Sequence, residues 1–122
     1  MKFGIVGNRT GWKQDFVIDK IREIISIERD DTFNFEVEII SGGADGVDYF
    51  AKHYAIGAGY VFEEFLPNMN EPSPERYFNR NKKIAEECDI LIAFDMKLGH
   101  SGTKNTIRYA RELNKEVFII TS

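Results

Sequence analysis

Short apolar runs alternate along this chain with segments in which apolar residues recur every three or four positions. The runs predict five β-strands, at Phe3–Val6, Val37–Ile40, Tyr60–Leu66, Ile90–Phe94 and Val117–Ile120. The helical spacing predicts four helices, near Trp12–Glu28, from Val47 to Ala58, from Ser73 to Cys88 and near Gly102–Leu113. Strand and helix therefore alternate from one end of the sequence to the other.

Such alternation is typical of an α/β protein with right-handed crossovers and a parallel sheet. The predicted fold class is a single Rossmann-like, three-layer domain over residues 1–122, with a mostly parallel five-stranded sheet and helices on both faces. Ile90–Phe94 is the most continuously apolar run, which predicts a central strand covered on both faces. The Glu63-Glu64 pair places Tyr60–Leu66 at a sheet edge.

Local signals also predict where two helices begin and end. Ser73 followed by Pro74 is expected to cap the third helix, with the proline in its first turn. That helix is expected to bury Tyr77 with Ile84. Gly59 is placed to end the second helix.

The composition narrows the classes of function. A net charge of −4 in 122 residues disfavours a general nucleic-acid binder, which normally carries a basic face. The single cysteine, Cys88, excludes an internal disulfide and a multi-cysteine metal site, so no metal is expected. No signal segment or run long enough for a bilayer is apparent, which predicts a cytoplasmic protein without a membrane partner. Tyr60, Phe62 and Phe65 on an edge strand make a homo-oligomer plausible.

Candidate chemistry gathers in loops that follow strands. In parallel sheets the ligand crevice lies beyond the carboxyl ends of the strands, where the strand order reverses. Gly7-Asn8-Arg9 follows the first strand, Ser41 to Asp48 follows the second, and Asp95 to Thr103 follows the fourth. The last two lead into helices, whose first amides and macrodipole favour an anion.

Four charged residues in or near these loops have two interpretations each. Arg9 is either a solvated side chain or a phosphate ligand, and Arg80 either lies on a basic helix face or caps a phosphate; both are expected at the surface. Asp48 either compensates a helix dipole or accepts a hydrogen bond from a ribose hydroxyl. Asp95 is either a plain loop carboxylate or a catalytic or sugar-binding group.

These blocks together resemble the SLOG superfamily of Rossmann-like domains, which includes the DNA-processing protein DprA and the LOG cytokinin-activating proteins. The blocks are Gly4 to Arg9, Ser41 to Asp48, Asn79-Arg80-Asn81 and Ser101-Gly102-Thr103, and the resemblance is greatest to the small stand-alone branch related to YspA and YpsA. It implies a nucleotide or nucleotide derivative, such as AMP, ADP-ribose or an NAD-like molecule, over the two glycine loops. The predicted ligand-binding residues are Gly7, Asn8, Arg9, Ser41, Gly42, Gly43, Ala44, Gly46, Asp48, Arg80, Ser101, Gly102 and Thr103.

The resemblance leaves three functions open. The first is binding of a phosphate-bearing nucleotide, in the manner of a sensor. The second is an enzyme acting on an N-glycosidic bond, such as a phosphoribohydrolase or deoxyribosyltransferase, with Asp48 or Asp95 as the candidate catalytic group. LOG phosphoribohydrolases have a glutamate where this chain has Thr106, which counts against their chemistry. The third is DprA-like binding of single-stranded DNA, which the net acidity makes unlikely.

Overall fold

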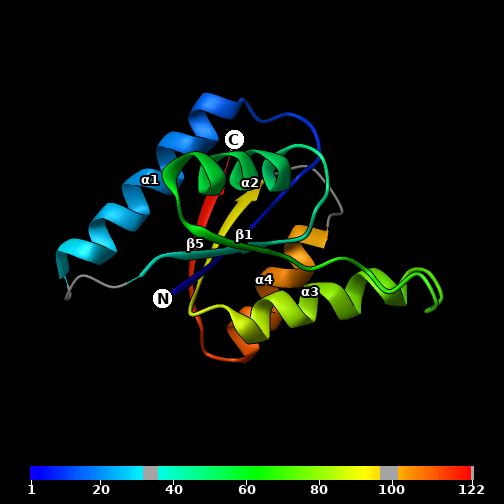
Figure 1. Cartoon of the computed structure of the whole chain (residues 1–122). Helices are drawn as coiled ribbons and strands as arrows, with labels where there is room; N and C mark the ends of the chain where they lie inside the picture. Colours follow the sequence, from blue (N-terminus) through cyan, green and yellow to red (C-terminus); the bar gives the residue numbers. More distant parts are fainter. Residues whose placement is uncertain (32–35, 97–101, 122) are drawn as a thin grey trace.

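The computed structural model describes residues 1–31, 36–96 and 102–121. It has a five-stranded sheet with two helices on each face (Figure 1). The elements in chain order are β1 (Lys2–Gly7), α1 (Gln14–Asp31), β2 (Glu38–Ser41), α2 (Val47–Ala58), β3 (Val61–Glu64), α3 (Glu75–Glu87), β4 (Ile90–Asp95), α4 (Gly102–Glu112) and β5 (Glu116–Thr121). None of the helices in these ranges has both the length and the apolar character needed to cross a bilayer.

The strand order is β3-β2-β1-β4-β5, and every neighbouring pair is parallel. The predicted α/β fold class is therefore confirmed. β3 lies at an edge, as its glutamate pair indicates. Every residue of β4 is buried, but the middle strand is β1, which pairs with both β2 and β4. The strand order reverses at β1, because β2 and β3 extend to one side of it and β4 and β5 to the other.

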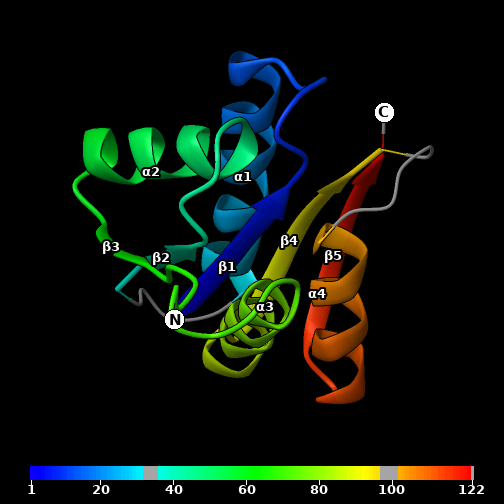
Figure 2. The ribbon, with the colours of Figure 1, turned by 90° about the vertical axis from the view of Figure 1, so that its right-hand side faces the viewer.

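Each face of the sheet has its own apolar core. α1 and α2 cover one face, where Val17 and Ala51 pack against strand residues such as Ile5. α3 and α4 cover the other, where Ile84 and Ile107 pack with Leu91 and its neighbours. Figure 2 shows the three layers, with the sheet running between the two helix pairs. Alternate side chains of a strand point to opposite faces, so the continuous apolar runs of β1 and β4 serve both cores.

The sequence signals for helix boundaries are confirmed for the end of α2 and wrong for the start of α3. Gly59 ends α2 in the left-handed conformation, at φ 74°, and its amide donates to the carbonyls near the helix end. Ser73 does not cap α3: no side-chain cap is present, and Pro74 occupies the cap position. The first amides of the helix find backbone acceptors instead, since Arg76 N donates to Pro72 O and Tyr77 N to Pro74 O. Backbone carbonyls of Pro72 and Pro74 thus take the place of the Ser73 hydroxyl as acceptors at the start of α3.

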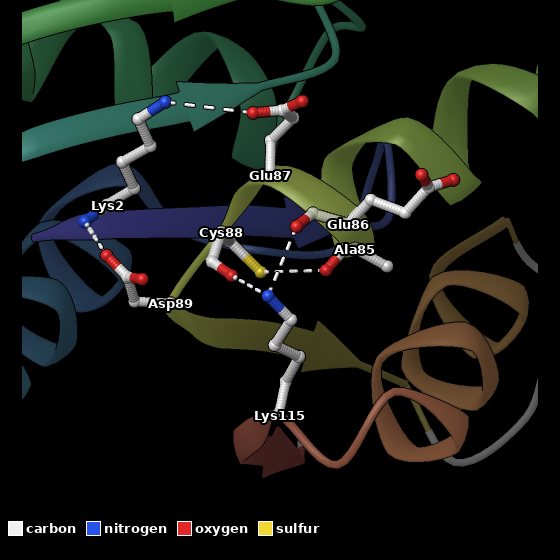
Figure 3. Close-up of polar contacts among 7 residues, drawn as sticks. All are labelled: Lys2, Ala85, Glu86, Glu87, Cys88, Asp89 and Lys115. Carbon is white, nitrogen blue, oxygen red and sulfur yellow. Dashed lines mark hydrogen bonds and ion pairs between the residues drawn. The ribbon is translucent and has the colours of Figure 1, made fainter.

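At the amino end of the sheet, polar contacts fix the turn between α3 and β4 (Figure 3). Lys115 Nζ donates to Glu86 O at 3.1 Å and to Cys88 O at 2.7 Å, which satisfies carbonyls at the end of α3. On the other side of the turn, Lys2 N donates to Asp89 Oδ2 at 2.7 Å. Cys88 itself is buried, and burial raises the pKa of its thiol to about 11. It is therefore a core residue and a poor nucleophile.

The aromatic patch expected on the edge strand is not exposed. Phe65 is buried in the core between the sheet and α3, while Tyr60 and Phe62 are partly buried against the core on the opposite face. Tyr60 also stacks edge-on against Tyr54 of α2. Neighbouring helices therefore cover these rings, and they provide no argument for self-association.

Candidate functional site

A cavity of about 380 Å³ lies over the carboxyl end of β1, where the strand order reverses. This is the position at which parallel α/β sheets usually bind ligands, and the volume lies in the range of small-molecule sites. Four segments contribute walls: the loop after β1, the loop between β2 and α2, the first half of α3, and the start of α4. The lining residues are Val6, Gly7, Asn8, Arg9, Thr10, Gly42, Ala44, Asp48, Tyr77, Arg80, Asn81, Ile84, Gly102, Thr103 and Thr106.

The loop after β1 is held by the side chain of Asn8. Its Oδ1 accepts hydrogen bonds from Trp12 Nε1, at 3.2 Å, and from the backbone amide of Met96, at 3.0 Å. One carboxamide therefore joins the start of α1 to the end of β4. Arg9 follows Asn8 and is exposed while also lining the cavity. A guanidinium is a planar donor group that suits phosphate or carboxylate oxygens.

The loop between β2 and α2 packs directly on the loop after β1. Val47 N lies 3.4 Å from Asn8 O. Gly46 has φ +76°, and a Cβ there would lie 2.3 Å from Arg9 O. Further back, the buried Ser41 hydroxyl donates to Ile5 O at 2.6 Å. The two loops therefore form one rigid wall of the cavity.

Asp48 is the buried carboxylate of this wall. Its side chain is 6% exposed, and Oδ2 accepts the Ala44 amide at 3.1 Å. Oδ1 is buried and finds no hydrogen-bond partner within the described ranges, because the nearby Ser41 hydroxyl donates its one proton to Ile5 O. Burial raises the pKa of Asp48 from 3.8 to about 6, although the Ala44 amide, Arg80, the Ser41 hydroxyl and Arg9 each lower it. A cavity-lining carboxyl with unused acceptor capacity and a raised pKa is a frequent mark of a functional group.

Arg80 of α3 spans the cavity wall instead of lying at the surface as expected. Its Nη1 donates to Gly42 O at 2.6 Å, and its Nε donates to Asn81 Oδ1 at 2.8 Å. Burial lowers the pKa of the guanidinium, while Asp48 raises it. Asn81 in turn donates to Gly102 O at 3.4 Å. Arg80 and Asn81 thus tie the loop after β2 and the start of α4 to α3.

α4 begins at the cavity. Gly102 and Thr103 line it, and the first amides of a helix lack acceptors within that helix. Thr106 uses its hydroxyl to donate to Gly102 O at 2.9 Å. Its side chain serves the helix backbone and supplies no carboxylate. Ser101, the remaining residue of this predicted block, lies outside the described residues.

The structure brings together most of the residues that the sequence singles out, but not all. The predicted residues that line the cavity are Gly7, Asn8, Arg9, Gly42, Ala44, Asp48, Arg80, Gly102 and Thr103. Ser41 lies behind the wall, and a Cβ at Gly43 would meet Glu64 and Leu66, away from the cavity. Gly46 faces the backbone of the loop after β1.

Asp95, the other candidate catalytic residue, is not part of the cavity lining. It is buried at the end of β4, where its Oδ2 accepts Lys104 Nζ at 2.6 Å. The ion pair gives this carboxylate a structural partner, and within the described residues Asp95 does not line the cavity. Asp48 is therefore the candidate acid or base that the geometry favours.

Sequence reasoning missed six lining residues: Val6, Thr10, Tyr77, Asn81, Ile84 and Thr106. Tyr77 and Ile84 belong to the apolar face of α3, so the sequence predicts them as core residues. In the structure the same face of the helix also lines the cavity. Asn81 was detectable, because it belongs to the Asn79-Arg80-Asn81 block on which the resemblance rests. No three His, Cys, Asp or Glu side chains in the described parts of the chain gather closely enough to hold a metal ion.

Comparisons with known proteins support the fold. No family model matches the chain, and no curated protein matches it in sequence. Among solved structures, TM1055, a structural-genomics target, is 18% identical, with a TM-score of 0.68 over 96% of this chain and 72% of that one. DNA processing protein A (DprA) from Streptococcus pneumoniae is 20% identical, with a TM-score of 0.74 over 99% of this chain and 50% of that one. The chain thus spans about half the length of DprA, and what it shares with both structures is a Rossmann-like α/β fold.

Proposed function

We propose that this protein binds a phosphate-bearing nucleotide or nucleotide derivative in the cavity over β1. The proposal rests on one observation. Arg9, the first turns of α2 and α4, and the buried carboxyl of Asp48 lie around one cavity of about 380 Å³. This volume suits a mononucleotide or part of a dinucleotide. The fold likeness to TM1055 and DprA is consistent with the same SLOG-type assignment.

The phosphate is assigned to the side of the cavity where Arg9 meets the helix starts. Helix N-termini attract anions through their free amides and the macrodipole, and an arginine can add a bidentate contact. Arg80 supports this side indirectly, because its bonds to Gly42 O and Asn81 hold the loop after β2 and α3 in place. The half-buried ring of Tyr77 supplies an apolar surface for a base on the α3 side.

Isothermal titration calorimetry against AMP, ADP, GMP, GDP, ADP-ribose and NAD tests the proposal. We expect at least one of these compounds to bind with micromolar or tighter affinity. A flat response to all of them, from protein with a cooperative thermal transition, would overturn it. Mass spectrometry of any small molecule that co-purifies with the protein provides an independent check.

Arg9→Ala should weaken nucleotide binding by about 1–3 kcal/mol, because it removes a charged donor from the phosphate side. Arg9 is exposed, so the melting temperature of the free protein should stay within error of the wild type. Arg111→Ala is the matched control, since Arg111 is an exposed arginine of α4 that does not line the cavity. Equal affinities in the two variants would show that the phosphate does not contact Arg9.

A second candidate function is cleavage of an N-glycosidic bond. Asp48 favours it, since a buried carboxyl with a pKa of about 6 can exchange a proton near neutral pH. Incubating the protein with nucleoside monophosphates and measuring free base by chromatography separates an enzyme from a binding protein. Base release that disappears in Asp48→Asn would favour the enzyme, and binding without base release would favour the sensor.

A further inference from the structure

We propose that Asp48 accepts a hydrogen bond from a ribose hydroxyl and so makes the cavity selective for nucleotides that carry this hydroxyl over their deoxy analogues. The inference rests on the proposed function and names the sugar that the site takes. Asp48 lines the cavity, is 6% exposed, and has one carboxylate oxygen without a partner in the part of the chain that the structure describes. A buried acceptor of this kind is costly unless a ligand or water donates to it.

The surroundings of Asp48 determine what it can accept. Its Oδ2 is engaged by the Ala44 amide, at 3.1 Å, which fixes the carboxylate at the start of α2. Gly42 lies against it, and a Cβ there would be 3.0 Å from Oδ2 and 2.8 Å from Arg80 Nη1. A glycine at position 42 therefore lets the carboxylate and the guanidinium lie close to the loop backbone, where a side chain would displace Arg80.

A phosphate oxygen is a poor partner for Asp48, because two anions repel each other in a site of low dielectric. A hydroxyl is a good partner, since it donates to the carboxylate and can accept elsewhere. In a nucleoside 5′-phosphate the sugar hydroxyls lie nearer to the phosphate than the amino group of the base does. With the phosphate beside Arg9, the ribose is the donor that best reaches Asp48.

The test compares AMP with 2′-deoxy-AMP and 3′-deoxy-AMP, and ADP-ribose with its 2′-deoxyadenosine analogue, by calorimetry at pH 7.5. We expect at least one deoxy compound to bind about 10- to 100-fold more weakly than its parent, the range for a hydrogen bond to a charged group. Asp48→Ala should abolish this discrimination. Asp48→Asn, which preserves the shape of the side chain, should reduce it to about 2- to 10-fold.

Asp45→Asn is the matched control, because Asp45 is an exposed carboxylate of the same loop that does not line the cavity. It should discriminate between parent and deoxy compounds as the wild type does. Equal binding of ribo and deoxy compounds by the wild type would overturn the inference and leave the proposed function intact. Unchanged discrimination in folded Asp48→Asn and Asp48→Ala would overturn it as well. Binding of none of these nucleotides would instead overturn the proposed function, and this inference with it.

Discussion

At the level of single residues, Asp48 combines burial, a place in the first turn of α2 and two nearby guanidinium groups. Burial is the larger influence, so its pKa rises to about 6 even though Arg80 and Arg9 favour the charged form. The ionised carboxylate is therefore held in the folded state at a cost. Residues kept in such a state usually serve a ligand or a reaction, since stability alone would favour a neutral side chain.

The cost of holding the ionised Asp48 carboxylate in the folded protein predicts how the free energy of unfolding changes with pH. Between pH 4 and pH 6 the folded protein binds more protons at Asp48 than the unfolded chain does, so stability falls as the pH rises through this window. A rise in pKa from 3.8 to about 6 corresponds to a contribution of about 3 kcal/mol to the free energy of unfolding, and this contribution is lost above pH 6. Urea unfolding of wild type and Asp48→Asn at pH 4 and pH 7 measures it.

The free energy of unfolding of Asp48→Asn, relative to the wild type, should be greater at pH 7 than at pH 4 by about this amount. Asp45→Asn serves again as control, because it removes an exposed carboxylate from the same loop. A difference between Asp48→Asn and the wild type that is independent of pH would contradict a raised pKa at Asp48.

At the level of elements, α3 is held at both of its ends by side chains. Near its start Arg80 joins it to the loop after β2, and at its end Lys115 from the chain before β5 caps its carbonyls (Figure 3). The two ends of the helix face opposite ends of the sheet. The helix that lines the cavity therefore also has polar contacts at the opposite end of the sheet.

Lys115→Met should lower the free energy of unfolding by about 1–3 kcal/mol, because it removes charged donors from the carbonyls of Glu86 and Cys88 while keeping most of the aliphatic chain. Chemical denaturation gives the value. Lys82→Met, at an exposed position of α3, also removes one positive charge and should change the free energy of unfolding by less than about 0.5 kcal/mol. Equal effects of the two substitutions would assign the loss to net charge and not to the cap.

The elements were predictable because their signals are local. Apolar periodicity identifies each of the nine strands and helices that lie in the described ranges. Because the carboxyl ends of parallel strands lie at one edge of the sheet, the sequence also places the loops after β1 and β2 and the start of α4 close together. The capping of α3 was not predictable, since backbone carbonyls at Pro72 and Pro74 replaced the hydroxyl of Ser73. Tyr77 was not predictable as a cavity residue for a related reason: which face of a helix lines a cavity depends on how neighbouring elements pack, and apolar periodicity carries no information on that packing.

At the level of the whole molecule, the net charge of −4 and the location of the cations bear on nucleic-acid binding. Arg9 and Arg80 lie at one cavity and are partly balanced by Asp48. A strand of DNA needs a continuous basic groove with stacking aromatic side chains, whereas a single nucleotide needs only local donors. This distribution favours the small ligand.

We therefore expect a fluorescently labelled oligothymidylate to show no saturable binding at physiological salt. Fluorescence anisotropy measures it, with AMP titrated in parallel as the small-ligand reference. Tight binding of the oligonucleotide with a steep dependence on salt would favour the DNA-binding alternative.

The contact between Gly46 and the backbone of Arg9 has a consequence for how this protein can change over evolutionary time. Any side chain at position 46 would meet Arg9 O at 2.3 Å and would also require an unfavourable φ of +76°. A substitution there can survive only if the loop after β1 moves in the same lineage. Across natural variants, position 46 and the length of the segment from Asn8 to Gly11 should therefore covary, and sequences that retain Gly46 should also retain a loop of this length.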